Sequence, residues 1–354
     1  MSLLYSDVEE ELRSSVRQLL ASRAPAATVL ARVESAEPYD RNLWRTLAVD
    51  VGCAGFAVPE KFGGAGASWR EVATVAEEFG RAVAPVPYLG AAMATAALLA
   101  GGDEDLLPAV AAGETTAVLV LPFATPPRAP VPAAVQAADG ALTGAVTGVA
   151  DVLTADVLLV PTAEGLWAVD AADARLTPLT SLDLTRPLAD VVLDASPARR
   201  VADPAWEAAL ATGAALLASE QLGVAQWCLD TTVEYLKTRH QFGRPIGSFQ
   251  ALKHRLAELW VAVTQARAVA RYTAGCLADD DADLAVAVAL AQAHCGPVAV
   301  RAAEECVQLH GGIGFTWEYP AHLYLKRAKA DAIALGTAER HRSALAGLVD
   351  LPPA

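Results

Sequence analysis

Arg239-His240-Gln241-Phe242-Gly243-Arg244-Pro245-Ile246-Gly247-Ser248-Phe249-Gln250 is the stretch around which the rest of the chain can be interpreted. It places arginine, glutamine and phenylalanine side chains beside two glycines and a proline, and a long amphipathic helical pattern flanks it on each side. This combination suits a flat, anionic ligand held at the junction of two helices. Taken alone, the stretch is equally consistent with side chains that only cap helix carbonyls.

The composition is that of a globular protein with room for two or three packed units. The 354 residues are 54% hydrophobic and 19% charged, which argues against a disordered chain. The net charge of −14 argues against a nucleic-acid partner, because phosphate binding needs clustered lysine and arginine.

The cysteines and apolar runs favour a cytoplasmic protein. The five cysteines include no C-x-x-C pair and lie mostly in apolar helical patterns, so we expect free buried thiols rather than disulfides or metal ligands. The acidic start, MSLLYSDVEEELRSS, lacks the basic and apolar regions of a signal peptide. The alanine-rich run from Tyr88 to Gly101 is too short and too poor in large apolar residues for a membrane span, and predicts a buried helix. We therefore expect no membrane partner.

Residues 1–116 predict an N-terminal helical domain, because apolar side chains recur at helical spacing in three successive segments. Between the second and third segments lies a glycine-rich loop, Gly55 to Ser68. Ser68 is expected to cap the next helix, with Glu71 as its partner in a capping box.

Residues 117–203 predict a small antiparallel β domain, either a sandwich or a barrel. Short β-branched or leucine-rich runs alternate there with proline, glycine and aspartate, and helical periodicity is almost lost: Ala117–Leu121, Leu142–Val149, Val157–Val160, Leu166–Val169 and Asp190–Asp194. The segment from Pro122 to Val135 holds five prolines, so it cannot pair as a central strand.

Residues 204–354 return to the helical period and predict a four-helix bundle. The four patterns cover 206–237, 252–269, 284–310 and 320–348. The expected fold class is therefore multidomain α+β and mostly α, with the order helical domain, β domain, four-helix bundle.

A second constellation closes the third bundle pattern. Gln308-Leu309-His310-Gly311-Gly312-Ile313-Gly314-Phe315 places three glycines in four positions, more than a helix C-cap needs. Such glycines let a ligand approach the backbone closely, and Gln308 offers both a hydrogen-bond donor and an acceptor. With this second group present, a ligand site becomes the better interpretation of both stretches.

These residues resemble the acyl-CoA dehydrogenase family. The resemblance rests on R-x-Q-F-G-x-x-I-x-x-F-Q (239–250), Q-x-x-G-G-x-G-F (308–315), V-P-E-x-x-G-G-x-G (58–66) and the helix–β–helix order, and so extends over nearly the whole chain. It implies FAD as the cofactor, α,β-desaturation of an acyl-CoA thioester, and a dimer of dimers built on the C-terminal bundle. It also implies an electron-transfer flavoprotein as the electron acceptor.

The same resemblance assigns the cofactor-binding residues. Arg239 stands where the family binds the FAD pyrophosphate, a contact that a guanidinium makes in bidentate fashion. The family directs these contacts across a subunit interface, to the FAD of the neighbouring chain. The residues implied along that cofactor are Arg239, Gln241, Phe242, Ile246, Phe249 and Gln250, with Gln308, Gly311 and Gly312 at its adenosine end.

The β domain departs from the family pattern. Members hold the flavin ring through a T-E-P-x-x-G-S-D loop and a W-I-T-N strand, and neither occurs between Thr116 and Asp203. The corresponding loop reads Pro122-Phe123-Ala124-Thr125-Pro126-Pro127-Arg128. We expect this chain's own flavin pocket to be poorly equipped.

The catalytic base is also missing. The family's I-Y-E-G-T glutamate corresponds to Leu335, which cannot accept a proton, and the alternative position on the first bundle helix is Gly213. Glu220, the nearest acid on that helix, lies about 10 Å along it from Gly213, which favours a solvated or ion-paired residue over a base. Asp331 lies one turn before Leu335 and is as poor a candidate, and we expect His310 to be a helix-terminal capping residue.

Three hypotheses follow. The chain is one subunit of a heteromeric acyl-CoA dehydrogenase, contributing FAD contacts while a homologous partner, in a heterotetramer, supplies the flavin pocket and base. Alternatively it is a self-sufficient flavoenzyme with an atypical base, or a scaffold subunit that binds no cofactor.

Overall fold

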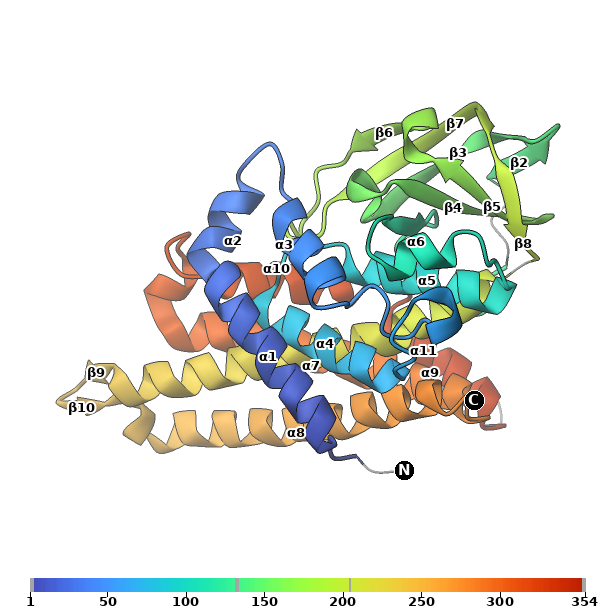
Figure 1. Ribbon diagram of the computed structural model, residues 1–354. Coiled ribbons are helices and arrows are strands. Elements are labelled where there is room, and N and C mark those ends of the chain that lie inside the picture. Colours follow the sequence, from blue (N-terminus) through green and yellow to red (C-terminus); the bar gives the residue numbers. More distant parts are fainter. Residues whose placement is uncertain (1–2, 131–133, 204, 352–354) are drawn as a thin grey trace.

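The computed structural model describes residues 3–130, 134–203 and 205–351. Figure 1 shows the long C-terminal helices running side by side, with the strands gathered on one side of them. Positions 1–2 of the acidic start, 131–133 of the proline-rich segment, Pro204 and the C-terminal positions 352–354 lie outside the described residues.

The N-terminal part is helical, as predicted. Its elements are α1 (Asp7–Arg23), α2 (Ala26–Val33), α3 (Arg41–Arg45), the π-helical turn η1 (Thr46–Asp50), the 3₁₀ turn η2 (Glu60–Phe62), α4 (Trp69–Ala82), α5 (Tyr88–Gly101) and α6 (Leu107–Ala111). The predicted capping box of α4 is confirmed: Ser68 Oγ accepts from the N–H of Arg70 (3.1 Å), and Glu71 Oε2 accepts from the N–H of Ser68 (2.9 Å). The alanine-rich run forms α5 and is buried along nearly its whole length.

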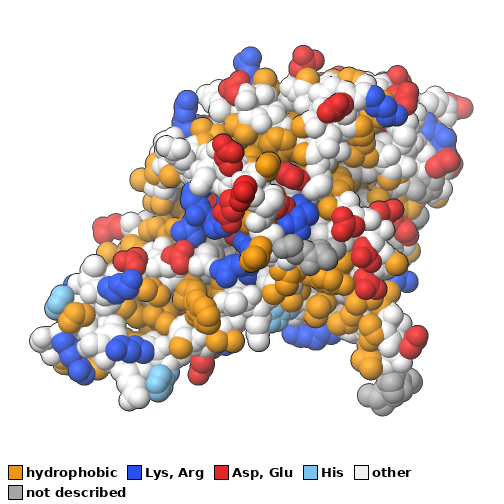
Figure 2. Space-filling model, turned by 60° about the horizontal axis from the view of Figure 1, so that its bottom comes forward, with side chains coloured by type: hydrophobic (Ala, Val, Ile, Leu, Met, Phe, Trp, Pro, Cys, Tyr) orange, Lys and Arg blue, Asp and Glu red, His pale blue; other side chains and the backbone are white. Residues whose placement is uncertain are grey.

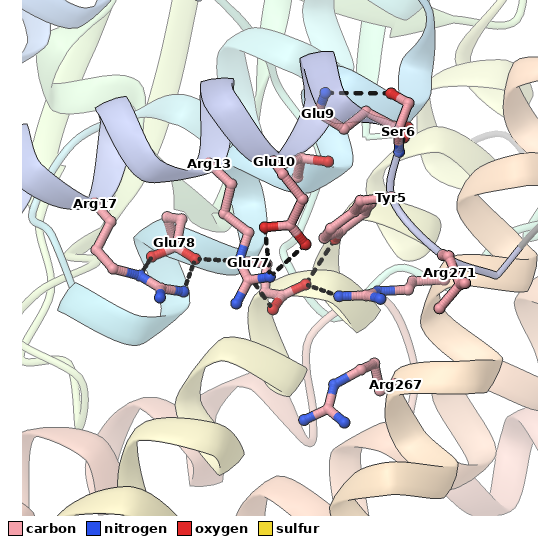
Figure 3. Close-up of polar contacts among 12 residues, drawn as sticks. Tyr5, Ser6, Glu9, Glu10, Arg13, Arg17, Glu77, Glu78, Arg267 and Arg271 are labelled. Carbon is pink, nitrogen blue, oxygen red and sulfur yellow. Dashed lines mark hydrogen bonds and ion pairs between the residues drawn. The ribbon is translucent and has the colours of Figure 1, made fainter.

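A polar cluster anchors α1 and the residues before it on α4 and α8 (Gln250–Ala278), as Figure 3 shows. The Tyr5 hydroxyl donates to Glu77 Oε2 (2.7 Å), and the guanidinium of Arg271 lies 3.7 Å from the centre of the Tyr5 ring. Arg13 and Arg17 both donate to Glu78, which is 1% exposed. The two buried carboxylates of α4 therefore hold the N-terminal segment in place.

Helix α4 crosses α7 (Trp206–Thr238) at a distance that only glycine permits. A Cβ atom at Gly80 would lie 1.9 Å from the carbonyl oxygen of Glu220, and one at Gly223 would lie 1.9 Å from that of Glu77. The absence of side chains at these two positions lets the helices touch through their backbones. This contact fixes the helical domain against the bundle.

The β domain consists of two four-stranded sheets. The strand orders are β1-β4-β5-β8 and β2-β3-β7-β6. The bounds are β1 (Ala117–Leu119), β2 (Val135–Ala138), β3 (Ala141–Ala150), β4 (Val157–Thr162), β5 (Gly165–Asp170), β6 (Arg175–Pro178), β7 (Leu188–Pro197) and β8 (Arg199–Ala202), with 3₁₀ turns η3 (Val152–Thr154) and η4 (Ala171–Asp173).

The prediction of a purely antiparallel domain was wrong, because β1 pairs with β4 in parallel, Ala117 opposite Val157. Parallel neighbours need a long crossover connection. The chain provides one by building β2 and β3 of the other sheet between β1 and β4.

Both faces of the first sheet are covered. Leu158 and Val160 of β4 belong to the core between the two sheets, whereas Leu159 belongs to the helical core. Successive side chains of a strand point to opposite faces, so this sheet is sandwiched between the second sheet and the helices. Because both faces of this sheet are buried, its strands have continuous apolar sequences and do not alternate between apolar and polar residues.

The C-terminal part contains α7, α8 and α9 (Leu284–His310), followed by the 3₁₀ turn η6 (Gly311–Phe315). The predicted fourth helix, 320–348, is two helices, α10 (Ala321–Asp331) and α11 (Ala338–Leu348). Leu335 and Gly336 adopt positive φ angles of 53° and 102°, and the N–H of Leu335 donates to the carbonyl of Phe123 (2.7 Å). A left-handed backbone ends a helix, and here it ties the break to the β domain.

Two helices have the length and hydropathy of a membrane span by composition alone. They are α7, whose apolar window is 89% buried within the protein, and the stretch Leu284–Phe315, whose window is 50% buried. Burial of α7 against α4 and α9 accounts for its apolar composition. The five cysteines are all buried and free, as predicted.

Candidate functional site

The two glycine-containing motifs meet at one end of the bundle. Helix α7 ends three residues after Tyr235, whose hydroxyl donates to the carbonyl of His310 (3.3 Å) at the end of α9. The rings of Tyr235 and His310 stack with centroids 4.3 Å apart. Arg239 and Gly311 each lie within a turn of this contact, so the structure brings together the residues that the sequence suggested for one ligand.

A β-hairpin projects from this end, formed by β9 (His240–Gln241) and β10 (Arg244–Pro245) (Figure 1). Its two-residue loop, Phe242–Gly243, has positive φ at both positions, 55° and 74°, as two-residue hairpin loops of the I′ type require. Phenylalanine in this conformation is strained, and its side chain is 88% exposed. A strained position with an exposed aromatic ring suits contact with a group outside this chain.

The aromatic side chains of the hairpin region support one another. The ring of Phe249 lies edge-on to Phe242 at 6.0 Å, and the guanidinium of Arg244 lies over the Phe249 ring at 4.0 Å. The amide of Ile246 donates to the carbonyl of Arg239 (2.8 Å), which closes the loop onto the end of α7. The short 3₁₀ turn η5 (Ile246–Ser248) then leads into α8.

The charge of this end is opposite to that of the protein. Between Tyr235 and Ala257 there are five lysines and arginines and no aspartate or glutamate, although the whole chain carries −14. Figure 2 shows Lys, Arg and His side chains at the end of the molecule that carries the hairpin. Arg255 is held by Glu305, whereas the Arg239 guanidinium has no hydrogen bond or ion pair to any of the described residues. Such a free guanidinium in a basic surround suits a phosphate.

The predicted cofactor residues are accessible to a ligand. Seven are exposed, and two, Ile246 and Phe249, are half-buried. A Cβ atom at Gly311 or Gly312 would meet nothing within 4 Å, so the backbone there is open to a ligand. The exposed seven are Arg239, Gln241, Phe242, Gln250, Gln308, Gly311 and Gly312.

The two positions where a base was sought face a closed space. Leu335, Leu210 and Met93 line a cavity of about 20 Å³, room for no more than a water molecule. A Cβ atom at Gly213 would lie 2.7 Å from the Met93 sulfur, so Met93 fills the space above that position too. At these two positions the chain therefore has neither a carboxylate nor space for more than a water molecule.

Glu220 is committed to a buried ionic cluster. Its carboxylate accepts from Nη2 of Arg186 (2.7 Å) and from Arg327, and all three side chains are at most 5% exposed. Burial alone would raise the pKa of Glu220, but the two guanidiniums outweigh it and lower the pKa. A carboxylate held in this way is a poor proton acceptor.

Asp331 and His310 are also occupied. Asp331 Oδ1 accepts from Arg186 (2.9 Å), while burial and the neighbouring Glu220 carboxylate raise the pKa of Asp331 well above its ordinary value. The His310 ring is bonded through Nδ1 to the carbonyl of Cys306 (2.6 Å) and through Nε2 to the Tyr319 hydroxyl (2.7 Å). Each thus serves the packing of the bundle.

The cluster contains residues that the sequence did not single out. Arg186 and Asp183 come from the loop before β7, and Arg327 comes from α10. Arg186 forms hydrogen bonds with Glu220 and Asp331, which lie 34 and 145 positions further along the chain. A local sequence pattern does not indicate partners at such separations. Met93 was missed for the same reason, because its role depends on the packing of α5 against α7.

Comparison with known proteins agrees with this geometry. Residues 6–114 match the acyl-CoA dehydrogenase N-terminal domain, and residues 204–348 match the C-terminal domain. The acyl-CoA dehydrogenase IpdE2 of Mycolicibacterium smegmatis is 38% identical over 335 residues, covering 94% of this chain and 95% of that protein. The acyl-CoA dehydrogenase FadE34 of Mycobacterium tuberculosis is 36% identical over 96% of this chain, which spans 48% of FadE34.

Solved structures show the same fold over the full length. The ChsE4-ChsE5 complex from Mycobacterium tuberculosis superimposes with a TM-score of 0.89 at 27% identity, covering 100% of both chains. A variant of the Tcur3481-Tcur3483 steroid ACAD gives a TM-score of 0.87 at 31% identity, covering 97% of this chain and 98% of that one. The chain belongs to the acyl-CoA dehydrogenase family, whose members are FAD-dependent oxidoreductases acting on CH–CH bonds.

Proposed function

We propose that this chain is one subunit of a heteromeric acyl-CoA dehydrogenase that desaturates the α,β bond of an acyl-CoA thioester. It contributes pyrophosphate and adenosine contacts to a FAD whose ring pocket and catalytic base belong to a homologous partner subunit. The observation that carries the proposal is a contrast within one chain: the bundle end presents unpaired groups for a cofactor, whereas the space at Leu335 is closed by Met93.

The comparisons support a two-component enzyme. ChsE4-ChsE5 is a complex of two named components, and the match covers 100% of this chain and 100% of the matched chain of that complex. FadE34 is about twice as long as this chain, which leaves room in one polypeptide for a second unit of the same size. We further propose a ring-bearing, steroid-type acyl group for the assembled enzyme, since the Tcur3481-Tcur3483 protein is a steroid ACAD.

Each residue at the bundle end has a definable task. Arg239 neutralises and orients the pyrophosphate, Gln308 hydrogen-bonds the adenosine, and Gly311 and Gly312 let that end of the cofactor reach the backbone. Phe242 excludes water from the interface. FAD, when bound, accepts the two electrons that desaturation removes. An electron-transfer flavoprotein in the cytoplasm is the proposed final acceptor.

The test compares the chain alone with the chain co-expressed with a homologue that carries the I-Y-E-G-T glutamate. We expect the chain alone to bind little FAD and to show no desaturation, and the pair to form a heterotetramer with flavin and activity. Native mass spectrometry gives the composition, and flavin absorbance per tetramer gives the stoichiometry. Yellow, active protein from this chain alone would refute the proposal.

Arg239→Ala tests the cofactor contact directly. A hydrogen-bonded charged contact contributes about 1.5–3 kcal/mol, so the FAD dissociation constant of the complex should rise roughly 10- to 150-fold. Arg23→Ala, at an exposed arginine at the end of α1, is the matched control and should leave it unchanged. Unaltered flavin affinity in Arg239→Ala would favour the scaffold hypothesis instead.

A further inference from the structure

The loop that connects α9 to α10 is closed by a hydrogen bond between its two ends. Gly311 turns the chain out of α9 with a positive φ of 63°, and η6 follows. The hydroxyl oxygen of Tyr319, two residues before α10, lies 2.7 Å from Nε2 of His310, the last residue of α9. This bond therefore encloses the segment that carries Gly311 and Gly312.

The His310 ring is oriented by its own helix. Its Nδ1 lies 2.6 Å from the carbonyl oxygen of Cys306, which can only accept, so Nδ1 carries the proton and donates. In the neutral ring Nε2 is then the acceptor, and the Tyr319 hydroxyl donates to it. Burial raises the pKa of Tyr319 to about 12, so its hydroxyl keeps the proton that this bond needs. His310 is 3% exposed, and shelter from water strengthens such a bond.

The same histidine also holds the end of α7. The Tyr235 hydroxyl donates to the carbonyl of His310 (3.3 Å), and the two rings stack with centroids 4.3 Å apart. The carbonyl of Tyr235 in turn accepts from the N–H of Arg239 (2.9 Å). His310 thus links the backbone of Arg239 to the start of the glycine-containing loop.

The middle of the loop packs against the last turns of α9. Gly314 is buried, and a Cβ atom there would lie 2.4 Å from the carbonyl oxygen of Val307. A Cβ atom at Gly311 or Gly312, in contrast, would meet nothing within 4 Å. The loop is therefore fixed on α9 at Gly314 and open to a ligand at its first two glycines.

A fixed separation between the two segments matters for a ligand that touches both. Ordering a flexible segment when a ligand binds costs conformational entropy, and rigidity that exists beforehand reduces that cost. The contacts of His310 fix the backbone of both segments, while the Arg239 side chain remains exposed.

We propose that His310, Tyr235 and Tyr319 are positioning residues for the FAD contacts of this chain. They hold the backbone of Arg239 and the glycine-containing loop at a fixed separation before the cofactor arrives. The inference rests on the proposed function and adds to it the side chains that preorganise the contacts. Part of the FAD affinity should therefore come from groups that act only through Arg239 and the loop.

Tyr235→Phe and Tyr319→Phe each remove one hydroxyl and keep the ring. In the complex with the partner subunit, each should raise the FAD dissociation constant about 2- to 12-fold, the factor that one neutral hydrogen bond gives. The matched control is Tyr272→Phe, which removes a hydroxyl that donates to Asp283 (3.4 Å) near the other end of α8. This control should bind FAD like the wild type. Melting curves establish that the variants are folded.

A double-mutant cycle distinguishes positioning from a general loss of packing. Arg239→Ala removes the guanidinium through which Tyr235 acts, so Tyr235→Phe should weaken FAD binding less than about twofold when it is added to Arg239→Ala. Likewise, His310→Phe removes the acceptor of the Tyr319 hydroxyl. Adding Tyr319→Phe to His310→Phe should therefore change the affinity little.

Hydrogen exchange of the full chain without cofactor gives a second measurement. Tyr319→Phe should speed the exchange of the backbone amides at 311–316 by a factor of about 2 to 12, because the bond that closes the loop limits its local opening. The amides of α4, in the helical domain, should exchange as in the wild type.

The possible outcomes separate this inference from the proposed function. Wild-type FAD affinity in both tyrosine variants, with a clear loss in Arg239→Ala, would overturn the inference and leave the proposed function intact. Additive effects of Tyr235→Phe and Arg239→Ala would also overturn it, because the tyrosine would then act independently of the guanidinium. So would unchanged exchange at 311–316 in Tyr319→Phe. Wild-type affinity in Arg239→Ala would refute the proposed function and this inference together.

Discussion

Glu220→Gln separates a structural role for this acid from a catalytic one. The cluster around Glu220 contains two guanidiniums, of Arg186 and Arg327, and three carboxylates, of Glu220, Asp183 and Asp331. Burial and the neighbouring Glu220 carboxylate raise the pKa of Asp331 well above its ordinary value. Replacing Glu220 by glutamine removes one negative charge and turns an amide N–H₂ group toward a guanidinium.

The expected cost follows from burial. All five side chains are at most 5% exposed, and removing one partner from a buried ion pair costs about 3–5 kcal/mol. With an unfolding entropy of ~2.1 cal/mol/K per residue, the 354 residues give ~0.7 kcal/mol/K. The melting temperature should therefore fall by about 4–7 °C.

Asp331→Asn is the matched control. The cluster disfavours the charged form of Asp331, whose pKa is raised, and asparagine keeps the oxygen that accepts from Arg186, so the melting temperature of this variant should stay within about 2 °C of the wild type. In Glu220→Gln, the Asp331 carboxyl group still lies beside Arg186 and can compensate in part. The double variant loses that compensation, so its destabilisation should exceed the sum of the single effects.

The pH dependence gives an independent check. The pKa of Glu220 is lowered in the folded protein, so its contribution to stability is complete above its unfolded pKa, about 4.3, and is lost as the pH falls through the folded value. The gap between wild type and Glu220→Gln should therefore narrow below about pH 4. A variant that melts like the wild type yet abolishes desaturation by the assembled enzyme would refute this reasoning and make Glu220 the base.

Two further predictions concern the closed site and the N-terminal anchor. Leu335→Glu should not create activity in the chain alone and should lower its melting temperature, because Leu335 is 1% exposed and faces a cavity of about 20 Å³. The control is Ile333→Glu, which should be tolerated because Ile333 is 56% exposed. Turnover of any acyl-CoA by Leu335→Glu alone would show that the site is open. Tyr5→Phe removes the hydroxyl that donates to Glu77 while keeping the ring under Arg271, so urea titration should show a loss of about 1.5–3 kcal/mol of unfolding free energy. An unchanged midpoint would mean that the Tyr5–Glu77 hydrogen bond adds nothing to the anchor beyond what the Arg13 and Arg17 contacts with Glu78 supply.

The parts of the structure that the sequence predicted well are those in which the signal is local. Ser68 and Glu71 lie three positions apart, and their capping box follows from that spacing. The glycines after Gln308 are likewise a local signal, and Gly311 adopts a positive φ of 63°, a conformation that few other residues adopt. The break at Leu335 was missed because α10 and α11 share one helical period, while the left-handed turn between them is held by Phe123, some two hundred positions earlier.

The same distinction explains why the candidate site was only half visible. The candidate ligand-binding groups at the bundle end, such as the Arg239 guanidinium, are not paired with other described residues. The residue types in the sequence therefore already indicate their chemistry. The space around Leu335 and Gly213 depends instead on contacts between residues far apart in the sequence: Met93 packs against Gly213, and Arg186 forms an ion pair with Glu220. Such contacts leave no pattern in the local sequence. A missing carboxylate at Leu335 could be read from the sequence, but only packing shows that the space around it is closed as well. A substitution that restores the carboxylate alone therefore cannot restore a site.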